Sequence, residues 1–159
     1  MSRQTIISSI LSLITGLLLM GIATFNSQDK ILMMEDASKY NFETTVEQFE
    51  QAVDEAGWSI INTHDMQQMI LRHGHEVNSV KIFEVCSARY SAELLKLDDE
   101  RIISPLMPCR VAIYEKSDGN TYIARMDNEE FARPFGGVIE EVMTTATRDV
   151  EEIVAQITD

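Results

Sequence analysis

The chain has 159 residues, of which 45% are hydrophobic and 25% are charged, so its length suits one folded domain and its composition excludes global disorder. Asp and Glu number 26 against 13 Lys and Arg, which gives a formal net charge of −13. Because a polyanion repels phosphates, we expect no nucleic-acid partner.

The N-terminal part of the chain is apolar and uncharged. No charged residue occurs from Gln4 to Gln28, and residues 5–25 are mostly aliphatic. A helix rises about 1.5 Å per residue, so about 20 such residues cross a hydrocarbon core of about 30 Å. We therefore expect residues 5–25 to be one hydrophobic helix, a single-pass anchor in the inner membrane. Arg3 would then stay cytoplasmic, and the folded domain would face the periplasm or the cell exterior.

A cleaved secretory signal peptide is the alternative for the same segment. Small residues at positions 21 and 23 stand where a signal peptidase cuts, and cleavage would release the domain as a secreted protein. In either case residues 1–30 comprise the anchor or signal peptide with a short polar connector. Residues 31–159 are then expected to form the folded domain.

The first half of that domain shows both strand and helix patterns. A strand is expected within residues 31–40. Thr44 and Thr45 have Glu47 and Gln48 three positions later, which is the capping-box spacing and predicts a helix that ends at Gly57. A second strand is predicted for residues 58–63, followed by one or two helical turns in residues 66–72.

The second half begins with a strongly alternating strand. Residues 80–86 alternate apolar and charged side chains, as a half-buried strand does. Ser87 is a suitable N-cap for a helix that reaches Leu97, and residues 98–108, with two prolines, are expected to form a loop.

A hairpin and a long helix complete the chain. Residues 109–115 and 121–126 are predicted strands, joined through a Ser-Asp-Gly-Asn turn at residues 117–120. Residues 133–137 interrupt the pattern, and residues 138–157 form an amphipathic helix. Helices, strands and a hairpin together predict an α+β fold with a mainly antiparallel sheet.

Several of these residues carry a resemblance to a known family. Val85-Cys86, the helix containing residues 92–95, and the Pro-Leu-Met-Pro-Cys-Arg run entering the strand at Cys109 resemble the bacterial and archaeal family called domain of unknown function 302. Residues 49–58 are similar to its opening unit. The resemblance covers residues 39–157 and implies a compact domain of the TATA-box-binding-protein-like kind, with helices on one face of an antiparallel sheet, and often a homodimer. It implies no established activity. The chain departs from the family at Ser87-Ala88, where the family tends to have Asn-Pro.

The two cysteines, Cys86 and Cys109, are the candidate site. Cys86 ends one predicted strand just before a helix, and Cys109 opens the next strand. If these strands are neighbours, both thiols lie at one edge of the sheet. A helix N-terminus favours a thiolate, so Cys86 is expected to be the more acidic thiol, and the cations Arg89 and Arg110 are expected to favour thiolates as well.

Three interpretations of the cysteine pair remain open from the sequence. One is a structural disulfide, which requires Cα atoms within about 7 Å. Another is two buried thiols that act as small apolar side chains. The third, which the resemblance supports, is a redox pair or a set of soft ligands for Cu(I) or haem.

Other candidate ligands and motifs are weaker. His73 and His75 flank Gly74 and would complete a metal site only if they approached Cys86 and Cys109. Met107, like Met66 and Met69, is expected to be a core or lining residue. No catalytic motif occurs, so no catalytic residue and no particular cofactor is assigned.

The function expected from the sequence is that of a membrane-anchored accessory module that binds a small ligand or a partner protein. The alternative is a thiol-based redox protein, or a metal- or haem-binding protein, that uses Cys86 and Cys109. A third possibility is a scaffold in which the cysteines only staple the fold.

Overall fold

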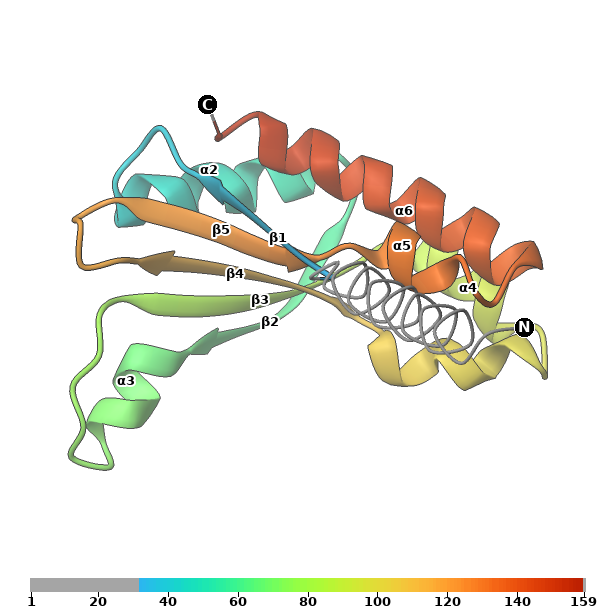
Figure 1. Ribbon diagram of the computed structural model, residues 1–159, viewed down its shortest axis with the longest axis horizontal. Helices are drawn as coiled ribbons and strands as arrows, with labels where there is room; N and C mark the ends of the chain where they lie inside the picture. Colours follow the sequence, from blue (N-terminus) through green and yellow to red (C-terminus); the bar gives the residue numbers. More distant parts are fainter. Residues whose placement is uncertain (1–31, 159) are drawn as a thin grey trace, which may run out of the picture. The chain divides into compact units, whose positions relative to one another are not determined.

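A computed structural model describes residues 32–158, which form an antiparallel sheet with helices on one face (Figure 1). The predicted anchor or signal peptide at residues 5–25 lies outside the described residues. Within residues 32–158, every helix is too short or too polar to cross a bilayer.

The five strands pair in the order β1-β5-β4-β3-β2, and every neighbouring pair is antiparallel. Three of the strands have the bounds expected from alternation of apolar and polar side chains. Their inward residues, such as Phe83, Val111 and Ile123, are 0% exposed and form the core under the helices. The strands are β1 (Met33–Ala37), β2 (Ser59–Asp65), β3 (Val80–Cys86), β4 (Cys109–Glu115) and β5 (Thr121–Met126).

Two long helices, α2 (Phe42–Glu55) and α6 (Gly137–Ala155), cover the sheet (Figure 1). The cap predicted at Thr44 or Thr45 is wrong. Asn41 is the N-cap, and its side-chain oxygen accepts a hydrogen bond from the Thr44 amide at 2.9 Å. Thr45 is instead buried and donates to the Asn41 carbonyl at 2.7 Å, which ties the first helical turn to the core.

Four shorter helices complete the described part of the chain, and the sequence predicted two of them. The helix α3 (Met66–Leu71) was expected, and so was α4 (Ala88–Leu95), although Ser87 makes no side-chain cap bond. The expected loop at residues 98–108 contains the 3-10 helix η1 (Glu100–Leu106). The helix α5 (Asn128–Ala132) was not predicted, because five residues are too few to show a helical period.

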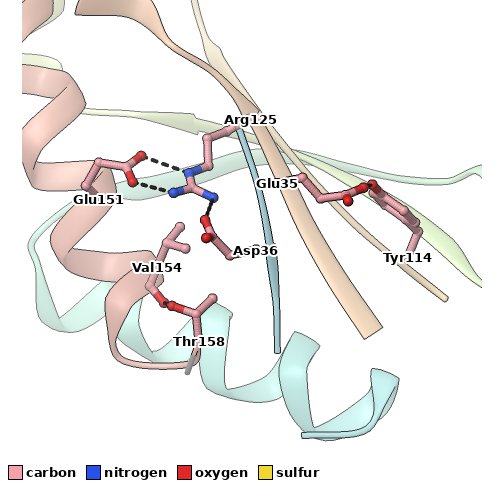
Figure 2. A network of polar contacts seen from close by, with 7 residues as sticks. All are labelled: Glu35, Asp36, Tyr114, Arg125, Glu151, Val154 and Thr158. Carbon is pink, nitrogen blue, oxygen red and sulfur yellow. Dashed lines mark hydrogen bonds and ion pairs between the residues drawn. The ribbon is translucent and has the colours of Figure 1, made fainter. Parts of the chain in front are cut away.

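A buried guanidinium joins segments that are far apart in the sequence (Figure 2). Arg125 on β5 has a side chain that is only 7% exposed. It donates two hydrogen bonds to the Glu151 carboxylate on α6 and a third to Asp36 on β1. The end of the chain closes over the same region, where the amide of Lys39 donates to the Ile157 carbonyl at 3.2 Å. This network fixes edge strand β1 and helix α6 to the centre of the sheet.

We predict that Glu151→Ala lowers the free energy of unfolding by about 3 kcal/mol, because it leaves the buried Arg125 cation with one carboxylate fewer. Urea unfolding followed by tryptophan fluorescence measures the change. Glu152→Ala, at the exposed neighbouring position, is the matched control and should change stability by less than about 0.5 kcal/mol. Equal effects of the two substitutions would contradict the role assigned to Arg125.

Candidate functional site

An apolar cavity opens where β3 and β4 meet the helices α4, η1 and α6. The centre of a water-sized sphere can occupy a volume of about 50 Å³ inside this cavity. A water needs roughly 10–15 Å³ by this measure, so the space takes an apolar group of only a few heavy atoms. The walls are mostly aliphatic and aromatic, with a few polar groups from serine, cysteine and asparagine. The walls include Trp58, Tyr90, Leu94, Ile103, Met143 and Ala146.

Both cysteines line this cavity, at the same end of the sheet. Cys86 is the last residue of β3 and Cys109 is the first residue of β4, and the register pairs Cys109 with Val85. The two thiols are free, so the structure contains no disulfide between them. Strand order therefore brings together the two sulfurs that are 23 positions apart in the sequence.

Each thiol has one polar neighbour. The Sγ atom of Cys86 lies 3.1 Å from the hydroxyl oxygen of Ser91, which is in the first turn and a half of α4. The amide nitrogen of Asn128, the first residue of α5, donates to the Sγ atom of Cys109 over 3.9 Å. The helix that the sequence missed thus supplies a contact to the candidate site.

The two arginines expected to favour thiolates point to carboxylates instead. The guanidinium of Arg110 is 71% exposed and lies 3.6 Å from Glu84. Burial, with a smaller contribution from the nearby Cys86, raises the pKa of Cys109 to about 11. The expectation that Arg110 acidifies Cys109 is therefore wrong, because loss of hydration dominates and the exposed guanidinium pairs with Glu84 instead.

An aromatic pair forms one wall of the cavity. The rings of Trp58 and Tyr90 lie 5.9 Å apart, and both polar ends reach Asp149 on α6. The Tyr90 hydroxyl donates to the Asp149 carboxylate at 2.8 Å, and the Trp58 indole donates to it at 3.4 Å. Arg89 lies over the Tyr90 ring, 4.4 Å from its centre, rather than beside Cys86. Burial and the hydrogen bond to Asp149 raise the pKa of Tyr90, so this hydroxyl stays a donor.

This wall was not found from the sequence, because Trp58 precedes β2, Tyr90 is on α4 and Asp149 is on α6, and the three positions have no shared spacing. The only available signal was Trp58, which is the single tryptophan of the chain.

The histidines do not join the cysteines. His73 and His75 follow α3 and precede β3, whereas Cys86 ends β3, and a seven-residue strand spans about 20 Å. His75 lines a separate surface pocket with residues of α3. Across residues 32–158, no three His, Cys, Asp or Glu side chains are grouped so that they can hold a metal ion.

We predict that Cys109, studied alone in a Cys86→Ser variant, reacts with iodoacetamide about 100-fold more slowly at pH 8 than an ordinary cysteine. With a pKa of about 11, only about one molecule in a thousand carries the thiolate at that pH. Mass spectrometry of alkylation between pH 7 and 11.5 measures the rate. The rate should rise through about pH 11, and a plateau reached below pH 9.5 would contradict the burial argument.

Comparisons with known proteins agree with this architecture. An uncharacterized protein of Aquifex aeolicus (strain VF5) is 22% identical over 135 residues, which cover 82% of this chain and 87% of that protein. The crystal structure of an uncharacterized conserved DUF302 protein from Bacillus stearothermophilus superposes with a TM-score of 0.72 at 14% identity. The superposition covers 80% of this chain and 98% of the other, and shows the same fold. The family model described as "Domain of unknown function DUF302" matches residues 34–157, and the chain belongs to this family.

Proposed function

We propose that this chain is an accessory module that binds a small apolar ligand, or the apolar end of a larger one, in the cavity beside Cys86 and Cys109. In the same proposal, residues 5–25 anchor the chain in the inner membrane and the domain faces the periplasm or the cell exterior. The uninterrupted apolar composition of that segment supports the anchor. The observation that carries the binding proposal is the preformed apolar cavity.

The cavity combines an apolar lining with a few polar groups, as small-molecule binding sites do. Most of its lining is apolar, with Leu94 and Ile103 among its buried walls, so an entering alkyl group loses contact with water. The thiols and the Ser91 hydroxyl stand at one end and are able to orient a polar headgroup. Burial of three or four methylene groups at about 0.8 kcal/mol each contributes about 2.4–3.2 kcal/mol, which corresponds to a dissociation constant of about 5–20 mM.

A short alkanol tests the proposal directly. Trp58 is the single tryptophan and lines the cavity, so its fluorescence reports occupancy. We predict that 1-pentanol changes the fluorescence of the full chain in detergent saturably, with a midpoint of about 5–20 mM. Ala146→Leu, which places a larger side chain in the cavity, should abolish the saturable change.

Ala155→Leu is the matched control, since Ala155 is exposed on the same helix. This variant should titrate as the wild type does. Partition of the alkanol into detergent contributes equally to all three proteins and leaves a linear background. Superimposable titrations of wild type and Ala146→Leu would refute binding in the cavity.

Thiol–disulfide exchange is the second candidate function. It is favoured because two free thiols line one cavity and because Cys86 is near enough to raise the pKa of Cys109. With oxidised glutathione as the oxidant, both thiols lose a hydrogen, one S–S bond forms between them, and two molecules of reduced glutathione leave.

Mass spectrometry after equilibration with glutathione tests this second candidate. We predict that the wild type loses two hydrogens and carries no glutathione, because the second thiol displaces the first mixed disulfide. Cys86→Ser and Cys109→Ser, which lack the second thiol, should each retain one glutathione. A wild type that carries glutathione on both cysteines would count against an exchange function.

A further inference from the structure

Exposed apolar side chains gather at one end of the sheet. At this end β3 and β5 end and β1 and β4 begin, and α4, η1, α5 and the start of α6 extend beyond the strands (Figure 1). We call residues 32–33, 87–108 and 127–138 the helical end. It holds seven of the twelve large apolar side chains that are exposed among residues 32–158, so this end is the first place to look for a partner.

The helix η1 presents two neighbouring isoleucines to opposite sides. Ile103 is 3% exposed and lines the apolar cavity, whereas Ile102 is 72% exposed. Packing within the domain accounts for Ile103, but no part of residues 32–158 covers Ile102 to a similar degree. Phe135, at the turn between α5 and α6, is likewise 48% exposed. Both side chains therefore fit an apolar environment outside the domain.

The chain enters the domain at the helical end. The carbonyl of Leu32 accepts a hydrogen bond from the amide of Asp127, the N-cap residue of α5, at 2.9 Å. The apolar run of the sequence ends at Phe25, so six residues separate it from Leu32. An extended chain spans at most about 3.6 Å per residue, which keeps Leu32 within about 25 Å of Phe25. An anchor formed by residues 5–25 therefore holds this end of the domain near the bilayer.

We propose that the helical end docks on the bilayer surface, with Ile102 and Phe135 at the boundary between headgroups and acyl chains. The docking rests on the membrane anchor of the proposed function. Apolar side chains that insert at this boundary reach about 5–10 Å into the membrane, which an exposed side chain does without unfolding its helix. Exposed apolar residues also occur around α3, such as Met69, but α3 lies at the opposite end of the sheet, away from Leu32 (Figure 1).

The charges near Ile102 favour zwitterionic lipid. Residues 96–101 contain three acidic and two basic side chains, and the chain as a whole has a net charge of −13. A surface rich in anionic lipid repels such a segment, whereas zwitterionic headgroups carry both charges. Arg101 is 55% exposed and pairs with Asp98 at 2.8 Å. Its aliphatic stem is able to lie along the apolar surface while the guanidinium stays among the headgroups.

Quenching of a relocated tryptophan tests the docking. Three full-length variants carry Trp58→Phe, which removes the single native tryptophan, together with Ile102→Trp, Phe135→Trp or Met69→Trp. Met69→Trp is the matched control, because Met69 is 47% exposed on α3. Each variant is reconstituted in phosphatidylcholine vesicles with brominated acyl chains, and circular dichroism confirms that it is folded. Acrylamide is the quencher in the water phase.

We expect the brominated lipid to quench Ile102→Trp and Phe135→Trp about threefold or more strongly than Met69→Trp, because bromine on the acyl chains meets only groups at that depth. Acrylamide should quench the three variants in the opposite order. Replacing part of the phosphatidylcholine by phosphatidylglycerol should reduce the quenching by lipid, since the added negative charge repels residues 96–101. An increase would overturn the preference for zwitterionic lipid.

Flotation of the same vesicles in a density gradient separates the docking from the anchor. A chain that floats, but whose tryptophan at both test positions is quenched only by acrylamide, overturns the docking and keeps the anchor. Protection from both quenchers means that protein, such as a second copy of this chain, covers the helical end, and it also overturns the docking. Equal quenching of Met69→Trp by lipid does the same. A chain that does not float overturns anchor and docking together, while the 1-pentanol titration still tests the cavity.

Discussion

The arrangement of this domain depends on the pairing of one buried cation, Arg125, with two carboxylates. Arg125 is the only charged side chain classed as buried among residues 32–158, in a chain that has twice as many acidic as basic residues. Removing a guanidinium from water is costly unless carboxylates pair with it. Asp36 and Glu151 meet that need from β1 and α6, so the edge strand and the last helix each have a fixed position against β5 (Figure 2). The same helix carries Ala146 and Asp149, which form part of the cavity and hold its aromatic wall.

The sequence predicted the sheet well where local pattern and tertiary burial coincide. The strands β3, β4 and β5 have the predicted bounds, because each alternates apolar and polar residues and each buries one face. The sequence predicted the helix start less well, because more than one side chain there can form the capping hydrogen bond. Thr44 and Thr45 have the capping-box spacing, yet the helix begins after Asn41 because Thr45 is drawn into the core. The helices η1 and α5 are too short for a periodic signal.

The candidate site was predicted in position but not in chemistry. Strand order was enough to place Cys86 and Cys109 at one end of the sheet. The effect of Arg110 was not predictable, because closeness in sequence does not show that this guanidinium would turn toward Glu84 on the neighbouring strand. The pairing of Met33 with Met126 was likewise hidden, since it needs the first strand to add to the sheet beside the last one. Alternation predicts which face a strand buries, but it does not identify the strand's neighbour.

The position of Cys109 in the wall of the apolar cavity has a consequence for how the two candidate functions relate. The Cys109 side chain faces the helices, because the residue pairs with the buried Val85 on the neighbouring strand. An apolar ligand in the cavity would cover the same sulfur that thiol–disulfide exchange requires to be accessible. The two candidate functions would therefore compete for one space, and this competition requires no change of shape.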